Sequence, residues 1–342
     1  MSLSTQNNKP PEPALDLKTI NNAQAIPCFP DFVPLDINIK NALHPRLSLT
    51  NDGVSEFTFA GLYLFRKRYN YRISRLKDDR GFIISGKQPE DHQAAQNNEK
   101  TNDDGEKSFF MTPCAAPDWD TLASLFKTHN YWKNISETVL DPVKDKLQEN
   151  GITVEEDRNN FDYLYNRTDL AELAGKKFHK KKNHVNNFKN TYTNYKQRPL
   201  TSALIPDAIK VLDRWRQDAN ARNAETGSKG SDADFIAAKE ALDLFDSLAL
   251  KGSIFYIDEK PAAWCLGESI ARGRMFAIHF EKAIDEYKGI YQFLNQAFAE
   301  SLPRFFTLIN REQDLGSEGL RQAKMTYRPC GFVKKYTGRL SV

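Results

Sequence analysis

The segment from residue 276 to 332 alternates between short apolar runs and helical patterns, and this alternation limits most strongly the folds open to the chain. An apolar run at 276–280 is followed by a glycine-containing turn and a helical pattern at 292–302. A second apolar run at 305–310 precedes a charged loop and a last helical pattern at 320–332. Strands that alternate with helices in this way indicate an α/β unit. Ligands of such units usually bind in a crevice where helix starts face strand ends.

The rest of the chain indicates further strands and helices. A chain of 342 residues is too long for one typical core, so we expect two domains. We predict a tail at 1–26, a first domain at 27–160 and a second domain at 161–342. In the first domain, the pattern predicts helices at 55–69, 118–131 and 141–150, and strands at 71–76, 81–85, 108–115 and 152–157, with a polar hairpin tip at 86–107. In the second, a helix at 206–220 precedes an antiparallel meander at 253–257, 262–270 and 274–282.

Composition excludes several classes of protein. A net charge of +3 means that any attraction to nucleic acid or membrane must come from local patches. No apolar run approaches the roughly 18 residues that span a bilayer, and the polar, proline-rich start lacks a secretory signal. The four cysteines lie far apart and form no CxxC pair, which argues against a zinc site or a disulfide scaffold. We therefore expect a cytoplasmic protein with no metal site and no transmembrane segment.

One segment is strongly basic. Apolar and aromatic residues recur from Leu170 to Tyr195 at three-, four- and seven-residue steps, the period of one helical face. Basic residues lie between them, up to Lys189, and the candidates for binding phosphate are Lys176, Lys177, His179, Lys180, Lys181, Lys182 and His184. A helix here would bury its aromatic stripe and expose a basic face. That face is either solvated or binds a phosphate-rich partner such as RNA or an anionic head group.

This order of elements resembles the core of the N-acetyltransferase (GNAT) superfamily. YKGIYQFL at 287–294 is similar to the superfamily's phosphate loop, in which backbone N–H groups at a helix start hold a pyrophosphate. Ala323, Tyr327, Gly331 and Phe332 match its pattern A-x-x-x-Y-x-x-x-G-F, whose tyrosine often acts as a general acid. The loop departs from the superfamily in having a tyrosine where a second small residue is expected, which crowds the backbone approach that coenzyme A needs.

Three longer motifs resemble a narrower family, the one named after the C-terminal catalytic domain of phosphatidylglycerol lysyltransferase. They are DYLYNRTDLAELAGKKFHKKKNHVNNF, HFEKA with YKGIYQFLN, and INREQDLGSEGLRQAKMTYRP, all within 162–336. The resemblance implies an α/β (α+β) fold of two tandem GNAT-like domains, each a mixed, largely antiparallel sheet flanked by helices. It also implies acyl or aminoacyl transfer, with aminoacyl-tRNA or acyl-CoA as donor and no other cofactor. The acceptor would be a hydroxyl or amine, for example on an anionic lipid or a cell-wall precursor.

Acyl transfer needs a polarised carbonyl, a stabilised oxyanion and a base for the acceptor. Glu281, at the end of the central strand, is our candidate base, with Tyr327 as candidate acid and Asp314 as a further catalytic candidate. Alternatively, Glu281 forms an ion pair with Lys282 or Arg321, and Tyr327 is a core residue.

Candidates for donor binding lie in the glycine turn and after the second apolar run. They are Lys288, Gly289, Tyr291, Asn310, Arg311, Arg321 and Lys324. The structural alternative is that the charged residues among them form a buried ion-pair network that holds the loop. His279 has apolar neighbours on a strand, so we expect a hydrogen-bonded core histidine rather than a base.

Three functions remain open. The leading one is aminoacyl transfer from an aminoacyl-tRNA, because the coenzyme A loop is altered. The second is an acyl-CoA-dependent N-acyltransferase. The third is a non-catalytic module that binds RNA or another anion through the basic helix.

Overall fold

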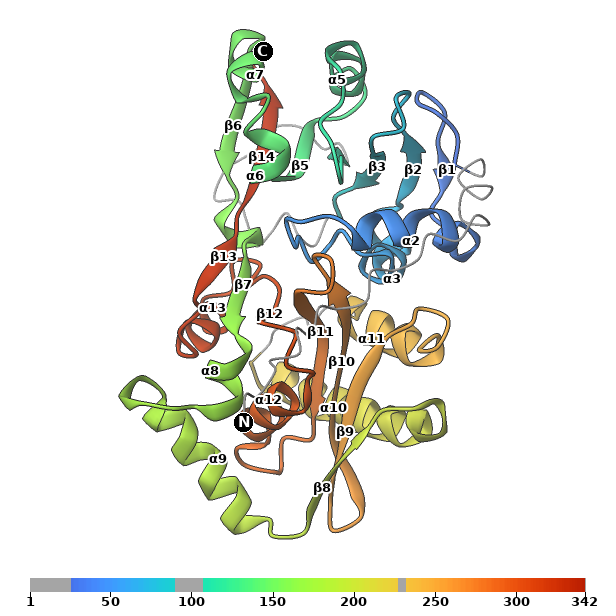
Figure 1. Ribbon diagram of the computed structural model, residues 1–342. Helices are drawn as coiled ribbons and strands as arrows, with labels where there is room; N and C mark the ends of the chain where they lie inside the picture. Colours follow the sequence, from blue (N-terminus) through green and yellow to red (C-terminus); the bar gives the residue numbers. More distant parts are fainter. Residues whose placement is uncertain (1–25, 90–106, 227–231, 342) are drawn as a thin grey trace, which may run out of the picture.

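The computed structural model describes residues 26–89, 107–226 and 232–341, whose strands form two seven-stranded sheets (Figure 1). The first sheet has the order β1 (Val33–Pro34), β2 (Arg72–Arg75), β3 (Phe82–Lys87), β4 (Ser108–Met111), β5 (Tyr131–Ser136), β14 (Lys335–Leu340) and β6 (Ile152–Glu156). The second has the order β8 (Tyr195–Pro199), β9 (Lys251–Ile257), β10 (Lys260–Ile270), β11 (Met275–Ala283), β12 (Leu308–Asn310), β7 (Asp162–Asn166) and β13 (Gly331–Val333).

The two sheets follow the same plan. In each, three antiparallel pairs are followed by one parallel pair and then by two antiparallel pairs. The parallel pairs are β4 with β5 and β11 with β12, and a helix connects each pair: α5 (Trp119–Phe126) and α12 (Ile290–Ser301). A parallel pair needs such a crossover, because its strands run in the same direction. The predicted fold class, two mixed and largely antiparallel sheets flanked by helices, is confirmed.

Strands β1 to β7 make up the first half of the chain and strands β8 to β14 the second half. The sixth strand in the order of each sheet comes from the other half. β7 follows β6 in sequence but lies between β12 and β13, whereas the final strand β14 lies between β5 and β6. In Figure 1, β14 rises from the lower half of the molecule to join the upper sheet. The expected boundary after residue 160 falls between β6 and β7, but residues 335–340 of the expected second domain belong to the first sheet.

Helices flank both sheets. Besides α5 and α12, the α-helices of the described residues are α2 (Lys40–Ser48), α3 (Phe59–Tyr69), α6 (Glu137–Leu140), α7 (Lys144–Glu149), α8 (Arg167–Glu172), α9 (His179–Thr191), α10 (Ile205–Thr226), α11 (Ala233–Asp243) and α13 (Glu318–Met325). The Thr58 hydroxyl caps the start of α3 by accepting from Gly61 N–H, and Asn70 ends the helix in the left-handed conformation. The largest apolar cluster packs α2 and α3 against α10 and α11, so it joins the two halves.

Several predicted boundaries were wrong. The basic segment is not one helix. α8 ends at Glu172, and Leu173 and Gly175, both with positive φ, interrupt the helical path before α9 begins. β8 begins at Tyr195, the last residue of the expected helical face. The predicted helix at 118–131 ends at Phe126, because residue 131 already belongs to a strand that pairs with β4 and β14. The last strand of the meander, expected at 274–282 with Glu281 at its end, runs from Met275 to Ala283, because its ladder with β10 extends that far.

Two further predictions concern the meander and the hairpin tip. The antiparallel meander is confirmed as β9, β10 and β11. The predicted hairpin tip lies mostly at 90–106, outside the described residues. Among the described residues, no helix has the length and apolar character required to cross a bilayer.

Candidate active site

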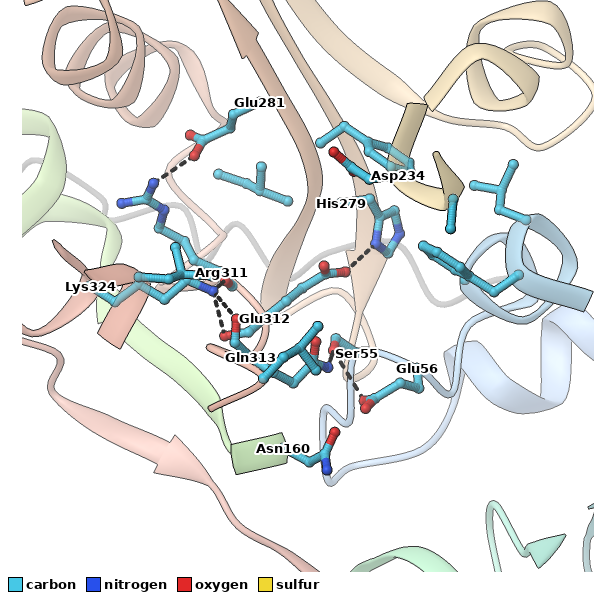
Figure 2. A pocket seen from close by; sticks show the side chains of 18 of the residues that line it. Ser55, Glu56, Asn160, Asp234, His279, Glu281, Arg311, Glu312, Gln313 and Lys324 are labelled. Carbon is cyan, nitrogen blue, oxygen red and sulfur yellow. Dashed lines mark hydrogen bonds and ion pairs between the residues drawn. The ribbon is translucent and has the colours of Figure 1, made fainter. Parts of the chain in front are cut away.

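A cavity of about 700 Å³ lies between the two sheets, a size typical of ligand sites. The first half of the chain contributes α3, the residues before it and part of β5. The second half contributes β11, the loop after β12, and α13. Figure 2 shows polar side chains from both halves pointing into this space. The main polar lining residues are Ser55, Glu56, Lys133, Asn134, Lys181, Asp234, His279, Glu281, Arg311, Glu312, Gln313, Lys324 and Tyr327.

The parallel pair β11 and β12 brings Glu281 and Arg311 together. The Arg311 guanidinium donates to Glu281 Oε2 at 2.5 Å, and Asn295 Nδ2 donates to Glu281 Oε1 at 2.8 Å. Both oxygens of the carboxylate are therefore occupied. The ion pair considered for Glu281 does form, but its partner is Arg311 rather than Lys282 or Arg321. Lys282 instead pairs with Asp234 at the rim of the cavity.

Glu312 lines the cavity and contacts His279. Its Oε1 lies 2.7 Å from His279 Nδ1, and Glu268 Oε1 lies 3.0 Å from His279 Nε2 (Figure 2 shows the first contact). Burial opposes the charged imidazole, but the hydrogen bonds and charges of the two carboxylates outweigh it and raise the pKa of His279 to about 10. The prediction of a hydrogen-bonded, buried histidine is confirmed.

The backbone that carries Glu312 adopts a rare conformation. Its φ is +54°, a value that non-glycine residues adopt rarely and often at functional sites. Asn310 Oδ1 accepts the Glu312 N–H at 2.8 Å, and Lys324 Nζ donates to the carbonyl oxygens of Arg311 at 2.7 Å, Glu312 at 3.1 Å and Gln313. Burial and the nearby guanidinium lower the pKa of Lys324 to about 8. Asn310 and Lys324 therefore hold the loop that presents Arg311 and Glu312.

Asp314 and Arg321 lie behind this loop and do not line the cavity. Asp314 is fully buried and accepts hydrogen bonds from Tyr163 at 2.6 Å and from Arg321 at 2.9 and 3.0 Å. Although burial opposes its charge, these donors lower the pKa of Asp314 to about 2. Asp314 and the partly exposed Arg321 thus form an ion pair, as in the structural alternative to their roles in chemistry and donor binding.

Lys181 connects the basic segment to the cavity. Its Nζ lies 4.1 Å from the centre of the Tyr327 ring, and both residues line the cavity. Burial raises the pKa of Tyr327 to about 12, although the Arg311 charge acts in the opposite direction. Of the other predicted basic residues, Lys177 pairs with Asp169 at 3.0 Å. The remaining five, Lys176, His179, Lys180, Lys182 and His184, are exposed.

The glycine turn before α12 packs against α9. Gly289 has a φ of +85°, and a Cβ atom at this position would lie 3.3 Å from His184 O. The Tyr192 hydroxyl accepts the Lys288 N–H at 3.2 Å. Of the donor-binding candidates Lys288, Gly289 and Tyr291, only Tyr291, in the first turn of α12, lines the cavity.

Sequence reasoning missed the polar residues that the first half contributes. Glu56 lies within a stretch interpreted as a buried helix, and it forms an ion pair with Lys335. Lys133 and Asn134 lie inside β5, where their polar side chains among apolar neighbours were the only available signal. In the described part of the chain, no group of histidine, cysteine, aspartate or glutamate side chains is arranged to hold a metal ion.

Comparison with known proteins finds one matching family and several similar structures. The sequence model of the family described as "Phosphatidylglycerol lysyltransferase, C-terminal" matches residues 47–338. A crystal structure of a conserved protein of unknown function from Bacteroides thetaiotaomicron is 27% identical, with a TM-score of 0.77, and the match covers 91% of this chain and 99% of that chain.

Two further structures share the fold. The C-terminal domain of a putative lysylphosphatidylglycerol synthetase from Agrobacterium fabrum is 14% identical, with a TM-score of 0.50 and coverage of 87% and 92%. L-PGS from Bacillus licheniformis is 13% identical, with a TM-score of 0.51 and coverage of 81% and 90%. An uncharacterised protein of Mycoplasmoides gallisepticum is 25% identical over 175 residues, which are 51% of this chain and 54% of that protein. The chain thus matches about half the length of this curated relative.

Proposed function

The chain belongs to the phosphatidylglycerol lysyltransferase C-terminal family, and on this premise we propose that it transfers an aminoacyl group from an aminoacyl-tRNA to a hydroxyl or amine acceptor. The position of Lys181 is the observation that carries the proposal. This residue belongs to the basic helix α9 and also lines the cavity beside Tyr327. A tRNA on the exposed face of α9 can therefore place its aminoacyl end in the cavity.

The basic face of α9 supports a tRNA donor. Lys180, Lys182 and His184 are exposed on this helix, and such side chains attract the phosphates of nucleic acids without regard to sequence. The contact between α9 and the turn at Gly289 also favours tRNA over coenzyme A, because it restricts the space around that glycine. The retained left-handed glycine before α12 is the feature that favours the alternative, an acyl-CoA donor.

The arrangement of the carboxylates favours Glu312 as the base. Both oxygens of Glu281 accept hydrogen bonds from Arg311 and Asn295, whereas Glu312 Oε2 accepts none from the described residues. Glu312 would take the proton of the acceptor as the acceptor oxygen or nitrogen attacks the aminoacyl carbonyl carbon. The new C–O or C–N bond forms while the ester bond to the terminal ribose of tRNA breaks.

Arg311 and Tyr327 complete the proposed chemistry. The guanidinium of Arg311 lies 5.2 Å from the centre of the Tyr327 ring, so both groups can face the same carbonyl. Arg311 would stabilise the negative charge that develops on the carbonyl oxygen. Tyr327 would protonate the ribose oxygen that leaves and would recover its proton from Glu312 through solvent, which restores the enzyme.

The experiment that tests this proposal compares donors. The purified protein is incubated with bulk aminoacyl-tRNA, tRNA without amino acids, coenzyme A or acetyl-CoA, and its thermal midpoint is measured at low and high salt. A ligand at about one hundred times its dissociation constant adds about 2.7 kcal/mol of stability, which raises the midpoint by several degrees. A rise with tRNA that fades at high salt, together with transfer of a radiolabelled amino acid to an added acceptor extract, supports the proposal. A rise with the coenzymes alone would identify an acyl-CoA enzyme, and tRNA binding without transfer would indicate a binding module.

A further inference from the structure

The side of the cavity built by the first sheet contains a second polar centre, which the proposed donor chemistry does not use. Lys133 and Asn134 are consecutive residues of β5, and both line the cavity. Neighbouring residues of a regular strand point to opposite faces of the sheet. Here the pairing of β5 with β14 is irregular, because Trp132 pairs with Gly338 while Ile135 pairs with Tyr336.

This irregularity is a β-bulge that redirects the Asn134 side chain. Two residues of β5 stand opposite one residue of β14, and Asn134 has a φ of +53°. Bulges of this kind occur next to active sites, where they change the direction of a side chain. The backbone of β5 is therefore built so that both polar residues face the cavity.

Asn134 has one polar atom without a partner. The residue is only 2% exposed, and its Nδ2 donates to Glu56 Oε1 at 3.1 Å. This bond fixes the orientation of the amide, because the opposite orientation would direct its oxygen at a carboxylate. The Asn134 Oδ1 atom is buried and accepts no hydrogen bond from the described residues. Among the described residues, seven buried side-chain polar atoms have no hydrogen-bond partner, and Asn134 is the only one of their residues that lines the cavity. A molecule bound in the cavity can therefore supply the missing donor.

Lys133 has no carboxylate partner in the described part of the chain. Its ammonium lies 4.8 Å from the centre of the Phe109 ring, 5.4 Å from that of Tyr69 and 3.5 Å from Gln88 Oε1. Loss of water lowers the pKa of Lys133, although the charge of Glu56 acts in the opposite direction. The two aromatic rings attract the ammonium but do not neutralise its charge, so an anion bound in the cavity would pair with it favourably.

We propose that Lys133 and Asn134 form the binding site for the acceptor. Lys133 holds a small anionic group, a phosphate or a carboxylate, and Asn134 Oδ1 accepts a hydrogen bond from a neighbouring hydroxyl or amine. As a statement about the acceptor, this rests on the proposed transferase function. Side chains link the site to the loop that presents Arg311 and Glu312: Gln313 Nε2 donates to Ser55 Oγ at 2.8 Å, and Ser55 Oγ lies 3.2 Å from Glu56 Oε2 (Figure 2). Lys133 and Glu312 line the same cavity, so an acceptor that occupies it can contact both.

Calorimetric titration of the full chain without any donor tests the proposal. The probes are inorganic phosphate, glycerol 1-phosphate, O-phosphoethanolamine and glycine, which separate phosphate from carboxylate and hydroxyl from amine. We expect wild-type protein to bind at least one probe with a hydroxyl or amine more tightly than it binds inorganic phosphate. Lys133→Met keeps the apolar stem but removes the charge, and it should weaken binding at least tenfold. Glycine tolerates the left-handed backbone at this position, so Asn134→Gly should keep the fold. It should lower the affinity only for the probes that carry a hydroxyl or amine.

The controls separate this site from general charge effects and from the donor reaction. Lys127→Met removes an exposed lysine at the end of α5 and should leave every affinity unchanged. Lys133→Met should fold with an unchanged or higher thermal midpoint, because it removes a poorly compensated cation. The site would be rejected if wild type bound no probe at millimolar concentration, or if Lys133→Met bound the probes as tightly as wild type. Because no donor is present, a failure to transfer amino acids from tRNA would leave this result unaffected.

Discussion

The ammonium of Lys335 lies 2.7 Å from the carboxylate of Asp162, and neither side chain is exposed to solvent. Lys335 begins β14 and Asp162 begins β7, the two strands that the halves of the chain exchange. Lys335 also forms an ion pair with Glu56 in the cavity wall. This buried contact therefore joins the two sheets and supports the wall of the cavity at the same point.

Loss of Lys335 should destabilise the whole fold. In Lys335→Ala, Asp162 remains buried without its counterion, which typically reduces the free energy of unfolding by about 3–5 kcal/mol. Urea unfolding followed by circular dichroism measures the change. The adjacent Lys334 forms an exposed ion pair with Glu156, so Lys334→Ala should change stability by about 1 kcal/mol or less. Equal effects of the two substitutions would show that the buried pair has no special role.

Glu312 and Glu281 should differ in their effect on turnover. Glu312→Gln should lower kcat by about 10²–10⁴-fold with little change in thermal midpoint, because it removes the proposed base. Glu281→Gln removes a charge paired with Arg311 and should act mainly through the position of that guanidinium. Transfer of radiolabelled amino acid under single-turnover conditions compares the two variants. Full activity in a folded Glu312→Gln protein would exclude Glu312 as the base.

His279 should make stability depend on pH. Because its pKa in the folded state is raised to about 10, the stabilisation it provides is fully present below about pH 6.5, the usual pKa of histidine. This contribution is lost as the pH rises through 10. The free energy of unfolding of wild type relative to His279→Gln should therefore fall by up to about 1.4 kcal/mol per pH unit in that range. Urea unfolding at several pH values measures the difference. Exposed His184→Gln is the control, and a difference that stays constant with pH would contradict a charged His279.

The exposed lysines of α9 should control the salt dependence of tRNA binding. Replacing Lys180 and Lys182 with glutamine should weaken binding and reduce the slope of log affinity against log salt by about 0.7–0.9 per lysine that contacts a phosphate. Filter binding at increasing salt concentrations gives the slope. Substitution of Lys210 and Lys239, exposed lysines on α10 and α11, supplies a matched loss of charge elsewhere. An unchanged slope in the α9 variant would mean that its basic face is only solvated.

Local patterns in the sequence predicted most of the elements of the fold. The meander β9–β11 was predicted because apolar runs separated by turn residues repeat at short intervals. The same patterns placed boundaries poorly. At Gly175, for example, the apolar residues keep their helical spacing although the helix is interrupted there. Periodicity describes the spacing of side chains and does not reveal a residue with a left-handed backbone conformation.

The candidate site was predicted only in part. Glu281, Arg311, Lys324 and Tyr327 were singled out from motifs near one another in the sequence, and all four line the cavity. Glu312 and His279, whose contact joins residues 33 positions apart, were not assigned to the chemistry. Lys133 and Asn134 were missed because no strand was predicted between the helices expected at 118–131 and 141–150, and local patterns do not reveal a bulge.

The amino-acid sequence by itself determined the order and type of most strands and helices, because propensity, periodicity and turn chemistry act over a few residues. Only the tertiary structure decided the exchange of β7 and β14, the pairs Arg311–Glu281 and Lys335–Asp162, and the bulge that places Lys133 and Asn134 of β5 at the cavity. The backbone hydrogen bonds of a strand are the same whichever sheet it joins. The choice therefore depends on burial and charge pairing between residues that lie far apart in the chain.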